Sequence, residues 1–109
     1  MPEPTAILEQ LRRLLINSDN LGQARTVERL IELRSADPAE FNRLLQGVDM
    51  WGGSGAVWEV GPTRMNRDEV QSFRAAIIAL AEWMESESVG FERSRFIADV
   101  FRKWNAAGI

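Results

Sequence analysis

The sequence predicts a single, mainly α-helical domain: a compact bundle of four to five short helices with a central glycine-rich loop or small β-hairpin. The chain has 109 residues, of which 45% are hydrophobic, and both values are typical of one globular domain. Apolar residues recur every three or four positions along most of the chain, which is the period of an amphipathic helix. This period stops over residues 49–62, where glycines cluster. We therefore treat residues 1–109 as one domain.

The N-terminal part of the chain predicts two helices. The first is expected over about residues 5–17, and the polar run 17–20 ends it. Asn20 followed by Gln23 predicts a capping box at the start of the second helix. The residues expected to face the core from these two helices are Ile7, Leu8, Leu11, Leu14, Leu15, Ala24, Val27, Leu30 and Ile31.

A short third helix has the clearest start signal in the chain. Asp37 is an N-cap acceptor, Pro38 fits the first helical position, and Glu40 places an acid in the first turn. Gly47 is expected to close the last turn in a left-handed conformation. The apolar stripe of this helix is Phe41, Leu44 and Leu45.

The glycine-rich segment has two interpretations. Residues 56–60 alternate between apolar and polar in the way of a short strand, and residues 52–55 would turn that strand back onto residues 49–51 as a hairpin. An ordered loop explains the same residues, so both interpretations stay open.

Two further helices are predicted in the C-terminal half. Asn66 and Glu69 form a second capping box, and the helix that it starts is expected to end near Glu85. The run 88–90 separates it from the last helix, whose outer face alternates acidic and basic residues. The apolar stripes are Val70, Phe73, Ile77, Leu80, Ala81 and Met84 in the first of these helices, and Phe96, Ile97, Val100, Phe101 and Trp104 in the last.

Composition limits the chemistry that the chain can perform. It contains no histidine and no cysteine, so the commonest general base, the commonest metal ligand and every thiol nucleophile are missing. We therefore expect a protein that is not an enzyme and has no metal site and no cofactor. The absence of cysteine fits a reducing compartment, and we expect a cytoplasmic protein without an export signal or membrane anchor. The net charge of −3 disfavours nucleic-acid binding.

Weak catalytic signals lie in the central segment. Ser54 sits among glycines as in a nucleophile elbow, but no histidine is available to activate it. Asp49 and Glu59 flank the segment and would approach each other in a hairpin, although we favour the interpretation that they are solvated rim residues. The glycine amides would also suit an anion or phosphate, although ordinary turn chemistry is favoured.

The four tryptophans are the most informative side chains. We expect Trp104 in the core, and Trp83 either beside the core or partly exposed. Trp51 and Trp58 bracket the glycines, and we favour packing of the loop onto the body over a role as partner-facing anchors. Glutamates gather at the end of the longest helix, where the helix dipole disfavours negative charge. They are Glu82, Glu85 and Glu87.

Residues 50–60, followed by the helix from Arg67 to Glu85, resemble small bacterial domains of unknown function. Those domains have an aromatic-Gly-Gly-x-Gly-Ser/Ala core and an acid before a helix. This sequence departs from them at Ala56, where serine is commoner, and at Glu59, where aspartate is commoner. Several such proteins are neighbours of secreted bacterial toxins, so the resemblance implies an immunity protein.

Our leading hypothesis is a non-enzymatic binding protein, an immunity-type inhibitor of a cognate bacterial toxin. One alternative is a small-ligand module that holds an anion or phosphate in the glycine-rich loop, and another is a structural subunit of a helical assembly. The expected partner is a protein rather than a nucleic acid or a membrane. The candidate contact residues are Asp49, Trp51, Gly52, Gly53, Ser54, Gly55, Trp58, Glu59, Glu82, Trp83 and Glu85.

Overall fold

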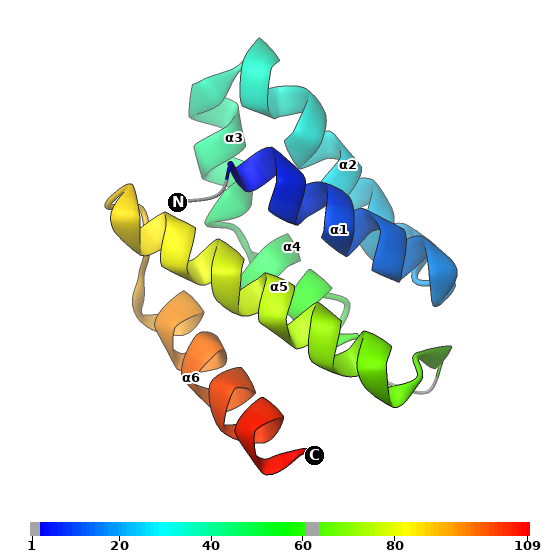
Figure 1. Cartoon of the computed structure of the whole chain (residues 1–109). Coiled ribbons are helices and arrows are strands. Elements are labelled where there is room, and N and C mark those ends of the chain that lie inside the picture. The colour runs from blue at the N-terminus through cyan, green and yellow to red at the C-terminus, as the bar shows by residue number, and fades with distance from the viewer. Residues whose placement is uncertain (1–2, 61–63) are drawn as a thin grey trace.

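Helices form where the sequence places an apolar stripe between a start and a stop signal. The computed structural model describes residues 3–60 and 64–109, and these residues confirm the predicted mainly α-helical fold (Figure 1). The five helices that correspond to the predicted ones are α1 (Pro4–Asn17), α2 (Leu21–Ala36), α3 (Pro38–Leu45), α5 (Arg67–Ser86) and α6 (Glu92–Ala107).

Two of the three predicted helix starts have the expected capping bonds. The backbone N–H of Glu40 donates to Asp37 Oδ1 at 3.2 Å, and the box at the start of α5 has both of its hydrogen bonds at 2.9 Å. The predicted box at the start of α2 is wrong. The Asn20 side chain instead donates to the buried Ser18 hydroxyl at 2.8 Å, and Gln23 donates to the Gly55 carbonyl at 3.2 Å.

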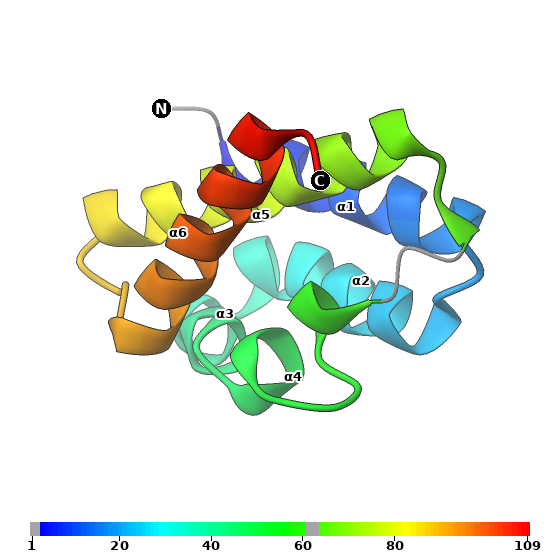
Figure 2. The same ribbon diagram turned by 90° about the horizontal axis from the view of Figure 1, so that it is seen from below.

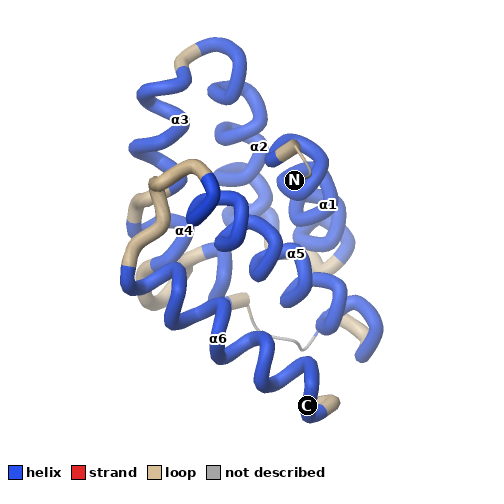
Figure 3. The backbone as a smooth tube through the Cα atoms, turned by 60° about the vertical axis from the view of Figure 1, so that its left-hand side comes forward, coloured by secondary structure: helices blue, strands red, loops and turns tan. Residues whose placement is uncertain are grey.

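The predicted small hairpin is also wrong: the described residues contain no strand (Figure 3). The segment instead forms a single helical turn, α4 (Val48–Trp51), and a 3₁₀ turn, η1 (Val57–Glu59). Both turns bury apolar side chains in the core, which an exposed two-stranded ribbon would leave in water. Gly47 precedes α4 with φ −84°, so it is not left-handed as predicted, whereas Gly55 has φ 87°.

The helices are arranged so that α1 packs between α2 and α5 (Figure 1). Helix α6 packs against α5 on the side away from α1, and α3 and α4 lie with α2 beneath α1 and α5 when the molecule is turned (Figure 2). The radius of gyration is 12.8 Å, and the principal extents are 36 × 26 × 26 Å, so the helices form one compact body.

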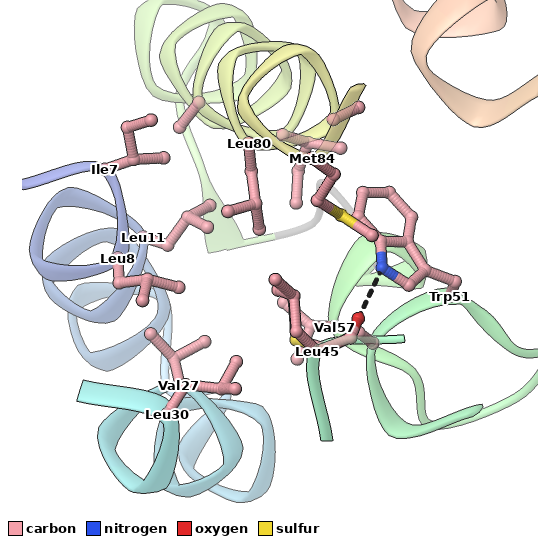
Figure 4. Close-up of a cluster of buried hydrophobic side chains, with 14 of the residues drawn as sticks. Ile7, Leu8, Leu11, Val27, Leu30, Leu45, Trp51, Val57, Leu80 and Met84 are labelled. Carbon is pink, nitrogen blue, oxygen red and sulfur yellow. Dashed lines mark hydrogen bonds between the residues drawn. The ribbon is translucent and has the colours of Figure 1, made fainter. Parts of the chain in front are cut away.

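One hydrophobic cluster receives side chains from all of these elements. Leu11 of α1 points toward Leu80 of α5, and Trp51 closes the cluster from α4, where its indole N–H donates to the Leu45 carbonyl at 2.8 Å (Figure 4). Because this N–H has an acceptor, the 1% exposed indole is buried without an unsatisfied polar group. None of the helices in the described residues is long and apolar enough to cross a membrane.

Helix α6 is less buried than the sequence predicts. Trp104 is 39% exposed and Phe96 is 59% exposed, so their assignment to the core is wrong. The reason is that α6 packs mainly on one neighbour, α5, and buries only a narrow stripe. That stripe consists of Ser94, Ile97, Ala98 and Phe101.

Candidate functional site

A groove opens between η1, the first half of α5, and α6. Its volume is about 630 Å³, within the range of ligand and side-chain binding pockets. We call it the α5–α6 groove. Its described lining residues are Trp58, Glu59, Val60, Met65, Val70, Phe73, Arg74, Arg93, Phe101 and Trp104.

One side of the groove is a row of three aromatic rings. The Trp58 ring centroid lies 6.2 Å from that of Phe101, which in turn lies 5.7 Å from that of Trp104. The Trp58 indole N–H donates to the Gly52 carbonyl, so the glycine-rich loop holds this ring in place. The row therefore presents a fixed apolar surface that joins η1 to α6.

Arg93 lies at the η1 end of this row. Its guanidinium is 5.4 Å from the centre of the Trp58 ring. Nε donates to the Trp51 carbonyl at 2.8 Å, and Nη2 donates to the Gly52 carbonyl at 3.3 Å. These carbonyls end α4 and have no helical partner of their own, so Arg93 caps this turn and fixes it to α6.

Arg74 lies at the other end of the row. Its guanidinium is 5.1 Å from the Trp104 ring centre and 5.9 Å from that of Phe101. Its Nη1 donates to the Ile109 carbonyl and, at 3.5 Å, to Asn105 Oδ1. Asn105 Nδ2 donates to the Gln71 carbonyl at 3.1 Å and so holds the end of α6 on α5.

The groove carries more positive than negative charge, although the chain has a net charge of −3. Among the described residues, neither Arg74 nor Arg93 forms an ion pair. The five remaining residues of the chain, 1–2 and 61–63, have no acidic side chain. Glu59 is the single acid among the described lining residues. The site therefore combines aromatic surface with two guanidinium groups that pair with no Asp or Glu side chain among the described residues.

The candidate residues of the central segment take different positions. Trp58 and Glu59 line the groove, and Gly52 supplies the carbonyl that Trp58 and Arg93 share. Trp51 is a buried core residue. Four exposed candidates of the segment do not line the groove in the described structure; they are Asp49, Gly53, Ser54 and Gly55.

The loop's own hydrogen bonds tie it to α4 and α2, and they use the amides of Gly52 and Ala56 but not those of residues 53–55. The Gly52 amide donates to the Val48 carbonyl, and the Ala56 amide donates to the Gly53 carbonyl. The Gly55 carbonyl accepts from the Gln23 side chain. This bonding and the burial of Trp51 agree with a loop that packs onto the body. The described residues contain no cluster of acids suited to hold a metal ion.

The candidate residues of α5 lie in the C-terminal half of that helix, apart from the groove. They are Glu82, Trp83 and Glu85. Glu85 pairs with Arg95 at 3.0 Å, and Glu82 pairs with Arg102 at 3.2 Å, so arginines of α6 neutralise this acidic end. Trp83 is 5% exposed and meets Phe41 edge-on at 6.2 Å. The structure therefore brings these three residues together with α6 and α3, not with Trp58.

Sequence reasoning missed most of the groove. Arg93 and Arg74 gave no signal, because their aromatic partners Trp58 and Trp104 lie about 30 or more residues away in the sequence. Trp104 gave no signal either, because it lies near the centre of the predicted stripe, whereas the residues that α6 buries are Ser94, Ile97, Ala98 and Phe101. A comparison of the chain with protein-family models, with curated proteins and with solved structures finds no match.

Proposed function

We propose that this chain is a non-enzymatic binding protein that uses the α5–α6 groove to bind a protein partner. The observation that carries the proposal is the row of aromatic rings with an arginine at each end, in which Phe101 is buried while Trp58 is partly exposed and Trp104 is exposed. Tryptophan and arginine are the side chains that contribute most to protein interfaces, and they do so in pockets that a partner can dry. Trp104 supports this use, since a 39% exposed indole gains from burial by a partner.

The apolar surface continues beyond the groove. Arg93 also lines two smaller hollows, one beside Val48 and Phe91 and the other beside Phe91 and Phe96. Val48 is 79% exposed and Phe96 is 59% exposed. Scattered apolar residues are normal on a surface, but these adjoin the groove through a shared arginine, and a continuous apolar patch is typical of an interaction site.

The specific role that we propose is an immunity-type inhibitor that binds and blocks a cognate bacterial toxin. The resemblance of residues 50–60 to small bacterial domains supports this role, and the chain's lack of histidine and cysteine suits a protein that acts by binding. Glu59 and Trp58 belong both to that motif and to the groove lining.

The test is copurification with the product of the neighbouring open reading frame, expressed together with the tagged chain. We expect a stable complex that Trp104→Ala and Phe96→Ala each weaken by about tenfold or more, because each truncation removes a large exposed apolar side chain from the contact. Ile16→Ala is the matched control, since Ile16 is 46% exposed on α1 and lies outside the groove. A complex that tolerates both the groove variant Trp104→Ala and the variant of the adjoining hollow, Phe96→Ala, would show that the contact lies elsewhere. Failure of that gene product to bind would contradict the inhibitor role.

A further inference from the structure

We propose that the α5–α6 groove recognises an acidic amphipathic segment of the protein partner. Apolar side chains of that segment lie on the row formed by Trp58, Phe101 and Trp104, and its carboxylates pair with Arg74 and Arg93. This inference rests on the proposed function, because it names the chemistry of the partner that the groove binds.

The apolar part of the argument comes from the groove lining. Besides the three rings of the aromatic row, four of the remaining lining side chains are apolar; they are Val60, Met65, Val70 and Phe73. A polar or uniformly charged segment would lose hydration against such walls and gain no hydrogen bonds. An occupant with large apolar side chains on one face gains from the same burial.

The acidic part of the argument comes from the hydrogen-bonding groups that the two arginines keep free. Nη1 of Arg93, and Nε and Nη2 of Arg74, donate to no acceptor among the described residues. A guanidinium prefers two parallel bonds to a carboxylate over bonds to neutral carbonyls. Both groups are held over aromatic rings, so little side-chain entropy is lost when a carboxylate binds them.

The charge pattern also separates acidic protein segments from other partners. The groove lining has two arginines and one acid, Glu59, so its net charge is positive. A basic segment would place its cations near both guanidinium groups and would be repelled more than it gains from Glu59. A nucleic acid also carries negative charge, but its binding depends on neutralising several phosphates along the backbone. Two arginines in a chain of net charge −3 do not provide that.

The experiment is calorimetric titration of the full chain with two synthetic helical peptides. The acidic probe carries leucine and phenylalanine on one face and glutamate beside them, and the basic probe has lysine in place of each glutamate. A single-stranded oligonucleotide is the third probe. We expect the acidic probe to bind at least about tenfold more tightly than the other two, because only it satisfies both the apolar row and the guanidinium groups.

Variants and salt then locate the interaction. Arg74→Gln and Arg93→Gln should each weaken binding of the acidic probe by about threefold to tenfold, the effect of losing one partly exposed charge pair. Arg13→Gln is the matched control, since Arg13 is exposed on α1 and forms no ion pair in the described chain. Because Arg93 also caps α4, salt titration of the unmodified chain gives a second measurement: added salt should weaken the acidic probe.

Four results would overturn the inference. The first three are equal binding of the acidic and basic probes, binding of neither probe, and tighter binding of the oligonucleotide. The fourth is binding of the acidic probe that neither the two arginine variants nor added salt weakens. The inference about the acidic segment can fail without the proposed function failing, and the reverse also holds. If the neighbouring gene product binds through Trp104 while Arg74→Gln and Arg93→Gln have no effect, the function stands and the acidic segment fails. If the acidic probe binds as expected but that gene product does not, the groove chemistry stands and the inhibitor role fails.

Discussion

At the scale of single residues, Gly52 is the position on which the site depends most closely. A β-carbon there would lie 2.6 Å from the Val48 carbonyl oxygen and 3.1 Å from Val48 Cα, which are both backbone atoms. The same residue supplies the carbonyl to which Trp58 and Arg93 donate. Because Gly52 has no side chain, it can lie against the Val48 backbone at the end of α4. In this position its carbonyl accepts from both Trp58 and Arg93.

Gly52→Ala should consequently lower the free energy of unfolding by about 1–3 kcal/mol, the cost of forcing an extra methyl group into a packed site. Gly53→Ala is the matched control, because a β-carbon at Gly53 meets nothing within 4 Å and its φ is not left-handed. Urea denaturation measures both variants. Equal stability of the two would contradict the close approach at Gly52.

Residue-level prediction from the sequence succeeded for local contacts and failed for distant ones. The favoured interpretation of Trp51 and Trp58 as residues that pack the loop onto the body agrees with their indole hydrogen bonds to nearby carbonyls. The partner of that loop on α6, Arg93, lies 42 positions after Trp51, and no local pattern connects them. The acids of α5 looked unpaired for the same reason, because Arg95 and Arg102 come from the next helix.

At the scale of elements, helix ends explain both the successes and the errors. The caps at Asp37 and Asn66 were predictable because the bonded groups lie three residues apart. Asn20 matches the same pattern, but its side chain bonds the buried Ser18 hydroxyl instead. The strand-like alternation at residues 56–60 failed because tertiary burial of Val57 favours a 3₁₀ turn over an isolated hairpin.

The end of α5 provides a test at this scale. Ser88 follows the helix with φ 60°, and the Val89 amide donates back to the Met84 carbonyl at 2.9 Å. A serine side chain is disfavoured in this left-handed conformation, which glycine adopts freely. Ser88→Gly should therefore stabilise the protein by about 0.5–1 kcal/mol, as measured by thermal denaturation.

A control substitution of serine by glycine within a helix tests whether the effect at Ser88 comes from its backbone conformation. Ser35→Gly lies in the last turns of α2, where the backbone is helical, and should destabilise by up to about 1 kcal/mol because glycine is a poor helix former. Destabilisation by both substitutions would show that the left-handed conformation at Ser88 carries no strain.

At the scale of the whole molecule, the sequence predicts the helices but not how they cross. Crossing angles depend on which side chains of two helices interlock, and the stripe of each helix alone does not determine this. The groove is a product of those crossings: it exists because α6 packs on α5 through a narrow stripe and leaves Trp104 beside Arg74. For this reason the fold class was predictable and the α5–α6 groove was not.

Because one cluster receives side chains from every helix, the described body should unfold in a single transition. Leu11 is fully buried where α1 meets α5, and Leu11→Ala should cost about 2–5 kcal/mol. Near-UV and far-UV circular dichroism should then shift together to a lower denaturant concentration. Ile16→Ala on the exposed face of α1 should shift neither by much, and separate transitions would show that part of the bundle folds independently.

The positions of the four tryptophans allow intrinsic fluorescence to report whether the α5–α6 groove is occupied. Trp51 and Trp83 are shielded from water at 1% and 5% exposure, whereas Trp58 and Trp104 border the open groove. Indole emission moves to shorter wavelength when surrounding water is displaced. Filling the groove would therefore change the fluorescence of one pair against a constant background from the other, without any attached dye.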